Sequence, residues 1–259
     1  MSSLSIAVHD SATMLRRDAK HSVRRISMTL SGLLTPTIML VLFNYFFGGT
    51  LGAGLGGVAH SGTYINYLAP GILIMSVASG CATTAINLCM DMSEGIIARF
   101  RTMAISRASV LTGQVIGSMI RTLISVALVG GVALLMGFRP ITNPVAWIAA
   151  CGVIALFTLA VTWIGVVFGL IGKTPAGANS LALIFLLLTF TSSAFARPDS
   201  MPAGVRWFAE YQPVSPVIDT VRGLLLGTSI GNSLVLALAW SVGLALVGYV
   251  SARAIYNRL

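Results

Sequence analysis

From Ile26 to Met90 the chain runs for 65 residues without an aspartate, glutamate, lysine or arginine. The surface of a soluble domain needs such residues, because they are almost never fully buried. In a bilayer the same stretch is expected, since about 20 apolar residues are enough to cross the hydrocarbon core. The run holds two such segments, separated by a glycine-rich, uncharged loop. We therefore predict an all-α integral membrane protein.

Composition supports this prediction along the whole chain. Charged residues make up 9% of the sequence, against roughly 25% in a soluble domain, and hydrophobic residues 56%. The 259 residues leave room for about six helical spans and exclude a large extramembrane domain. The three cysteines are odd in number and show no CxxC spacing, so we predict neither a disulfide framework nor a metal site.

We predict six transmembrane helices that form one membrane domain, residues 26–259, with spans at about 26–47, 67–89, 111–137, 145–171, 178–196 and 232–254. An even number of spans places both termini on the same side. The basic residues that share this side are Arg16, Arg17, Lys20, Arg24, Arg25, Arg99, Arg101, Arg107, Lys173, Arg253 and Arg258. By the positive-inside rule, both termini are cytoplasmic and the protein is a multi-pass protein of the cell membrane. The net charge of +9 therefore indicates anionic lipid and topology rather than nucleic acid.

Two connecting regions carry helix signals of their own. Within residues 1–25, apolar positions at spacings of three and four form one stripe beside basic residues, which predicts an N-terminal interfacial amphipathic helix. A disordered basic tail is the alternative. Between Arg197 and Arg222, prolines alternate with Trp207, Phe208 and Tyr211. Prolines interrupt helices and aromatic residues favour the membrane interface, so we expect short re-entrant outer helices before the sixth span.

Sequence patterns that resemble nucleotide-binding motifs lack features that those motifs require. Gly52–Gly57 spells G-x-G-x-x-G but follows a membrane span rather than a strand. Gly172-Lys173-Thr174 resembles the end of a P-loop, yet Val167 stands where that motif needs glycine. The histidines and acids form no catalytic constellation, so we expect no catalytic residues and no cofactor in this chain.

The segment Asp91–Arg107 is the most charged one that faces the cytoplasm in this topology. Ile96, Phe100 and Met103 share one helical face, while Arg99 and Arg101 lie off it. Such a helix is either a turn that lies on the membrane or a projection that inserts into a cytoplasmic partner.

The residues Glu94-Gly-Ile-Ile-x-Arg99-Phe100-Arg101-x-Met-x-Ile-x-Arg107 resemble the cytoplasmic coupling segment of type-2 ATP-binding-cassette exporter permeases, most of all the daunorubicin-resistance branch. A second stretch, Phe208-Ala-Glu-Tyr-Gln-Pro-Val-Ser-Pro-Val followed by Val221-Arg-Gly-Leu-Leu-Leu-Gly227, is similar to the outer segment of that branch. Together with the six-span layout, the resemblance extends over nearly the whole chain. One departure is Ala104, which stands where the family usually has proline and alters the expected docking geometry.

The resemblance implies a division of labour. A separate P-loop ATPase, in two copies, binds ATP and magnesium, and a second permease chain of the same or another kind completes the pump. It also implies a cytoplasmic coupling helix between spans 2 and 3 that contacts the ATPase through Glu94, Arg99, Phe100, Arg101 and Arg107, with Phe100 as the apolar anchor. The implied function is export of a hydrophobic or amphipathic substrate, such as a drug, antibiotic or lipid.

Other functions remain open on sequence grounds. Export of a lipid-linked glycan is the nearest alternative. An ATPase-independent secondary carrier is the alternative from another class, but it should show intramembrane carboxylates, which the predicted spans lack. A purely structural membrane scaffold is weaker, because it would not need the charged coupling segment.

Polar side chains inside the predicted spans are the candidates for a substrate path: Asn44, Thr83, Thr84, Asn87, Thr189, Thr191 and Ser192. The alternative for each is hydrogen bonding between helices, and Gly113-x-x-x-Gly117 likewise indicates helix packing. Arg121 is the one charge within the predicted third span. If that span begins near Leu111, Arg121 lies about 15 Å into the membrane and is functional. If the span begins near Gly117, the Arg121 side chain snorkels to the cytoplasm. We favour the second arrangement.

Overall fold

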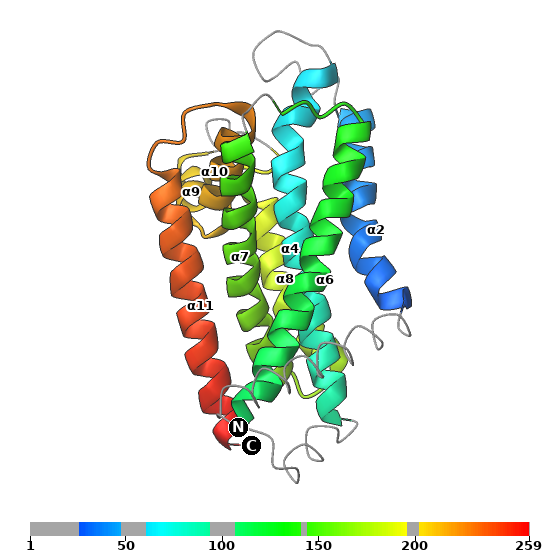
Figure 1. Ribbon diagram of the computed structural model, residues 1–259, viewed down its shortest axis with the longest axis vertical. Coiled ribbons are helices and arrows are strands. Elements are labelled where there is room, and N and C mark those ends of the chain that lie inside the picture. The colour runs from blue at the N-terminus through cyan, green and yellow to red at the C-terminus, as the bar shows by residue number, and fades with distance from the viewer. Residues whose placement is uncertain (1–25, 48–60, 94–106, 141–143, 196–201, 259) are drawn as a thin grey trace.

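The computed structural model describes residues 26–47, 61–93, 107–140, 144–195 and 202–258, and all the regular structure in these ranges is helical (Figure 1). The helices are α2 (Ile26–Leu42), the π-helix η1 (Phe43–Phe47), α4 (Ser61–Ser93), α6 (Arg107–Leu135), α7 (Pro144–Ile171), α8 (Pro175–Phe190), α9 (Ala203–Tyr211), α10 (Val214–Leu226) and α11 (Ser233–Arg258). The predicted all-α class is confirmed. The predicted interfacial helix, residues 1–25, and the predicted coupling segment up to residue 106 lie outside these residues.

Four described helices are long and apolar enough to cross a membrane: Tyr64–Ser93, Leu111–Leu135, Pro144–Ile171 and Ser233–Arg258. They coincide with the predicted second, third, fourth and sixth spans. Two shorter apolar helices, Leu34–Phe46 and Pro175–Phe190, fall on the predicted first and fifth spans. The helix of the fifth begins at Pro175 but ends at Phe190, short of the predicted residue 196. At 1.5 Å per residue, α8 is about 24 Å long, less than the ~30 Å hydrocarbon core.

The long helices run side by side along the molecule, with α4 at the centre (Figure 1). Helix α4 packs against α2, α6, α7, α8 and α10, and α7 packs against α11. The short helices α9 and α10 lie at the end where α11 begins, which we term the α10 end. The opposite end holds the α7–α8 turn and the last residues of α11, and we term it the C-terminal end.

Glycines allow the central helices to approach closely. A Cβ atom at Gly165 of α7 would lie 2.9 Å from the Cys81 carbonyl oxygen of α4, and one at Gly169 would lie 2.8 Å from that of Ala85. Close backbone approach at small residues is the usual packing mode between helices in lipid, where no hydrophobic force drives them together. The α4–α7 contact therefore depends on this Gly165-x-x-x-Gly169 pair.

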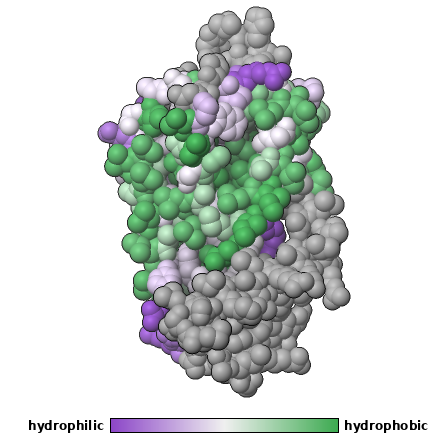
Figure 2. All heavy atoms as spheres, viewed as in Figure 1, coloured by the Kyte–Doolittle hydropathy of each residue, from purple (hydrophilic) through white to green (hydrophobic). Residues whose placement is uncertain are grey.

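Apolar residues predominate across the middle of the face seen in Figure 2, and hydrophilic residues gather toward the two ends. Many large apolar side chains of the described residues are exposed, among them Ile124 and Leu128 of α6 and Val235 of α11. Lipid covers such surfaces in a membrane, whereas water would not. The surface therefore agrees with the hydropathy of the spans.

Candidate functional site

A polar pocket lies between α4 and α6, in the middle of two apolar helices. On α4 its wall is formed by Ser76, Gly80, Thr83 and Thr84, whose spacing places them on one helical face. The Ser76 hydroxyl donates to the Ile72 carbonyl at 3.1 Å, and that of Thr84 donates to the Gly80 carbonyl at 2.8 Å. Because each proton is used within α4, the lone pairs of these oxygens can accept hydrogen bonds.

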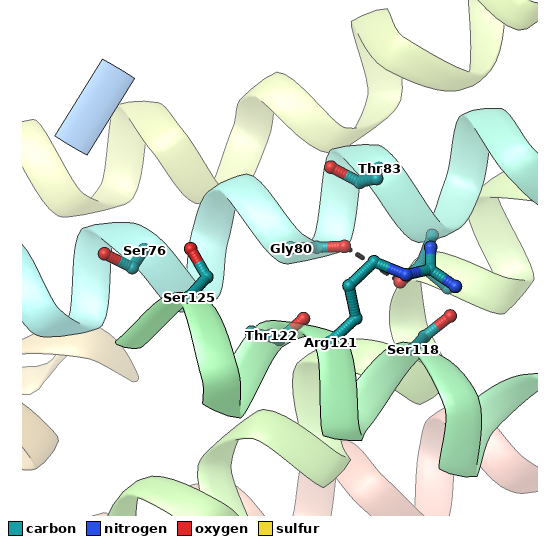
Figure 3. Close-up of a pocket in the computed structure, with 8 residues that line it drawn as sticks. Ser76, Gly80, Thr83, Ser118, Arg121, Thr122 and Ser125 are labelled. Carbon is teal, nitrogen blue, oxygen red and sulfur yellow. Dashed lines mark hydrogen bonds between the residues drawn. The ribbon is translucent and has the colours of Figure 1, made fainter. Parts of the chain in front are cut away.

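The facing wall belongs to α6 and has the same periodicity. Ser118, Arg121, Thr122 and Ser125 follow one another at spacings of three, one and three residues, so they share one face of α6 (Figure 3). Ser118 and Thr122 are buried, and Arg121 is half-buried. Two polar helix faces therefore meet inside the bundle.

Gly80 sets the distance between the two walls. A Cβ atom there would lie 2.4 Å from the Thr122 hydroxyl oxygen and 2.6 Å from its methyl carbon. Such contacts require the Thr122 side chain or α6 to move. A larger residue at position 80 would therefore change the pocket's shape.

The pocket has a volume of about 30 Å³, enough for one or two water molecules or a single small polar group. The Ser118 hydroxyl oxygen is fully buried and has no hydrogen-bond partner among the described residues. An orphaned buried hydroxyl costs on the order of 1–3 kcal/mol, so a site that retains one is suited to a bound water or solute group.

Arg121 reaches into this pocket from α6. Its side chain extends back along α6, and the guanidinium lies beside Ser118 and toward α4 (Figure 3). This direction leads toward the C-terminal end, as snorkelling requires, yet the side chain also lines the pocket. The pocket thus places the Arg121 guanidinium beside hydroxyl oxygens of both helices, and its role as a substrate contact or a snorkelling residue stays a prediction.

The candidates on α8 occupy a different place, at the end of that helix. The hydroxyl of Thr189 donates to the Phe185 carbonyl at 2.9 Å, that of Thr191 to Leu187 at 3.1 Å, and that of Ser192 to Thr189 at 2.6 Å. All three thus bond to the backbone of their own helix end. None of them lines the α4–α6 pocket.

Helix α8 is short because the chain becomes non-helical after Phe190, although the residues that follow are still buried inside the protein. Ser192, Ser193 and Ala194 are at most 1% exposed. Non-helical backbone at membrane depth is tolerated only where protein satisfies its polar groups. Here the Ser193 carbonyl accepts hydrogen bonds from the Tyr67 hydroxyl at 2.9 Å and from Arg222 Nη2 at 2.8 Å.

Arg222 of α10 is the centre of this second polar cluster. It forms an ion pair with Asp219 at 2.7 Å, donates to the Tyr67 carbonyl at 3.2 Å and lies 3.9 Å from the centre of the Tyr67 ring. Burial raises the pKa of the Asp219 carboxyl, and the Arg222 charge and hydrogen bonds from Ser193 and Arg222 oppose that rise. The groups satisfy one another, so we assign this cluster to structure rather than to transport.

The remaining predicted residues lie apart from the pocket. Asn44 is half-buried in η1, and its side-chain oxygen has no partner among the described residues. Asn87 is half-buried on α4 but does not line the pocket. Arg107 is the first residue of α6, whereas Glu94, Arg99, Phe100 and Arg101 fall outside the described residues.

Sequence reasoning had identified Thr83, Thr84 and Arg121 but missed five residues that complete the pocket: Ser76, Gly80, Ser118, Thr122 and Ser125. Serine and threonine are common in membrane helices, so single positions carry little information. The available signal was the matched spacing of small and polar residues on two successive spans.

Comparison with known proteins identifies the family. The ABC-2 type transporter family model matches residues 11–226. The chain is 28% identical over 214 residues to the "Daunorubicin resistance ABC transporter permease protein DrrB1" of Streptomyces coeruleorubidus, covering 82% of this chain and 71% of that protein. It is 24% identical over 230 residues to the "Probable doxorubicin resistance ABC transporter permease protein DrrC" of Mycobacterium tuberculosis, covering 88% and 81%. This multi-pass membrane protein belongs to the ABC-2 type transporter family.

Proposed function

We propose that the chain is the membrane-spanning permease subunit of an ATP-driven exporter for hydrophobic or amphipathic small molecules. The observation that carries this proposal is the family match over residues 11–226, together with relatives named for daunorubicin and doxorubicin resistance. Membership of this family also favours an ATP-driven pump over an independent secondary carrier.

We further propose six spans, with α2 and η1 as the first and α8 as the fifth. Helix α8 is shorter than the hydrocarbon core, but the buried turn after Phe190 and helix α10 fill the remaining depth. In this topology α9 and α10 are the outer re-entrant helices.

The charge distribution supports cytoplasmic termini in the cell membrane. Lys173, Arg253 and Arg258 lie at the C-terminal end, while two of the cations at the α10 end, Arg206 and Arg222, are paired with carboxylates. Lys and Arg residues close to the ends of spans are more frequent on the cytoplasmic side. The C-terminal end therefore faces the cytoplasm in this proposal.

The ATPase is a separate subunit, present in two copies, that binds ATP and magnesium, and a second permease chain completes the assembly. Glu94, Arg99, Phe100, Arg101 and Arg107 form the contact with it. Closure of the ATPases on ATP pushes this segment, and the spans reorient as rigid bodies between inward-open and outward-open states. No catalytic step takes place in the permease.

The α4–α6 pocket is the part of the path that meets polar groups of the cargo. A half-buried arginine in the middle of a membrane helix is costly, so its retention is expected where a polar solute passes. The two helices follow each other in the chain, and the proposed coupling segment connects them directly. A push on that segment therefore acts on both walls of the pocket.

Co-purification from native membranes tests this function. We expect a P-loop ATPase to accompany the wild type and to be lost from Phe100→Ala and Glu94→Arg, with at least a tenfold fall in daunorubicin export. The matched control is Leu135→Ala, an 89% exposed position at the other end of α6, which should change neither. An intact complex without any ATPase, or variants that retain it, would overturn the proposal.

A further inference from the structure

Arg121 lies at the edge of the polar face of α6, next to the part of the helix that faces lipid. Thr122 and Ser125 line the α4–α6 pocket on one side of it. On the other side, Ile124 and Leu128 follow Arg121 at three and seven residues, so they share one flank of the helix, and both are more than half exposed. The pocket therefore borders an apolar flank of α6 on which lipid chains lie.

The α6 wall of the pocket offers hydrogen-bond donors, whereas the α4 wall offers acceptors. The Thr83 hydroxyl donates within α4, to the Ser79 carbonyl at 3.0 Å, as the other two hydroxyls of this wall also do. The structure shows no such bond for the hydroxyls of Thr122 and Ser125 within the described residues. Arg121 adds a guanidinium with five N–H donors, more than a single partner occupies. A ligand between the walls therefore gains most from acceptor oxygens that face α6.

Charge narrows the ligand further. Among the described residues that line the pocket, Arg121 is the one charged side chain, and none is a carboxylate. A hydrogen bond from a guanidinium to an ionised oxygen is roughly twice as strong as one between neutral groups. A cationic amine would instead meet the like charge of the guanidinium. An anionic oxygen group is therefore favoured over an amine or an alcohol.

Size selects among the possible anions. The pocket has a volume of about 30 Å³, which holds about two water-sized groups. The two oxygens of a carboxylate match this size, and they also match the fork of a guanidinium, which binds carboxylates through two parallel hydrogen bonds. A phosphate monoester has more oxygens and needs a wider pocket. The geometry therefore favours a carboxylate.

We propose that the α4–α6 pocket binds the carboxylate of an amphiphilic acid, with Arg121 as its bidentate partner and the hydroxyls of Thr122 and Ser125 as further donors. The apolar part of the ligand lies along the flank of α6 formed by Ile124 and Leu128, in place of a lipid chain. The statement that this acid is cargo rests on the function proposed above. Its binding depends on the pocket alone, so it can be measured without the ATPase.

A set of ligands with one alkyl chain and different polar groups tests the chemistry of the site. Laurate, dodecanol, dodecylamine and dodecyl phosphate compete with radiolabelled laurate for the purified protein in phosphatidylcholine nanodiscs, with empty nanodiscs as the blank. We expect saturable laurate binding and at least about tenfold weaker competition by the other three ligands. Absence of saturable laurate binding, or equal competition by dodecanol or dodecyl phosphate, would overturn the carboxylate site. Equal competition by acetate, which has no chain, would overturn the role of the apolar flank.

Substitutions of Arg121 test its assigned role. Arg121→Gln removes both the charge and the fork, so laurate should bind at least about tenfold more weakly. Arg121→Lys keeps the charge without the planar fork and should lose about threefold. The matched control is Arg253→Gln, which removes a cation from an exposed position near the end of α11 and should leave laurate binding unchanged. Equal losses in Arg121→Gln and Arg253→Gln would indicate a general charge effect and overturn the site.

Gly80→Ala tests the position of the site while Arg121 is kept. A Cβ at Gly80 lies 2.4 Å from the Thr122 hydroxyl oxygen, so this variant reshapes the pocket and should weaken laurate binding severalfold. Gly131→Ala is the matched control on α6, because a Cβ there meets nothing within 4 Å. Thermal unfolding of both variants verifies that the fold is retained. Unchanged laurate binding in a folded Gly80→Ala protein would place the site elsewhere.

The carboxylate site and the exporter function can fail separately. Laurate binding by a chain that recruits no ATPase would support the site and reject its role in export. Recruitment of the ATPase by a chain that binds no laurate would support the exporter function and reject the site.

Discussion

Arg222 forms hydrogen bonds with more backbone groups than an arginine in a surface ion pair usually does. With its side chain 12% exposed, it binds Asp219 and the carbonyls of Tyr67 and Ser193 at once. We predict that Arg222→Ala lowers the free energy of unfolding by about 2–4 kcal/mol, because buried carbonyls and a carboxylate lose their donor. Denaturant unfolding in detergent micelles measures this change.

The other described ion pair on the outer helices is the control. Arg206 and Glu210 are 46% and 37% exposed, and exposed pairs contribute about 0–1 kcal/mol. Arg206→Ala should therefore change stability little. Equal effects of the two substitutions would contradict the role assigned to Arg222.

At the scale of single residues, the sequence predicted only some of the side chains that line the α4–α6 pocket. Thr83, Thr84 and Arg121 were predicted together with residues that the structure places elsewhere, such as Thr189 and Ser192. Thr84 and Thr189 each donate to a carbonyl of their own helix, yet only Thr84 lines the pocket, so the two have the same sequence signal. Only the neighbouring helix distinguishes them, and single-chain periodicity does not contain that information. Their role in the substrate path stays a prediction.

The contact between α4 and α7 provides a prediction for whole elements. Gly169→Ala places a Cβ 2.8 Å from the Ala85 carbonyl oxygen, so α7 must move away from α4. We predict a loss of about 1–3 kcal/mol, the usual cost of overpacking. Gly152→Ala, on the same helix with nothing within 4 Å, should instead gain up to about 1 kcal/mol from helix propensity. Thermal unfolding of the two variants should shift in opposite directions, and a shared sign would contradict the proposed packing.

Helix positions were easier to predict than helix contacts. Hydropathy predicted the four long spans because about 20 consecutive apolar residues are a strong signal. It extended the fifth helix too far, since Ser192–Phe195 is buried by tertiary contacts rather than by its place in a helix. Gly165 and Gly169, which the sequence did not single out, approach α4 closely, and the predicted packing role of Gly113 and Gly117 stays a prediction.

For the molecule as a whole, family and class could be predicted because two segments and the span layout agree with each other. The resemblance to type-2 exporters was carried by charged and aromatic residues outside the apolar spans, where composition is less uniform. The α4–α6 pocket could not be predicted in the same way. It forms where one face of α4 meets one face of the next described helix, α6, and helix-packing geometry decides which faces meet.

The short helix α8 makes the six-span topology testable. Lys173 is exposed before α8, and Asn232 is exposed after α10 at the start of α11. If α8 crosses the membrane and α9 and α10 do not, these positions lie on opposite sides. In a background with the exposed Cys151 replaced by alanine, a membrane-impermeant thiol reagent should label Asn232→Cys in intact cells and Lys173→Cys only after permeabilisation. Cys81 and Cys89 are buried and provide a low background. Labelling of both positions from one side would mean that α8 does not span, and labelling in the reverse order would invert the proposed orientation.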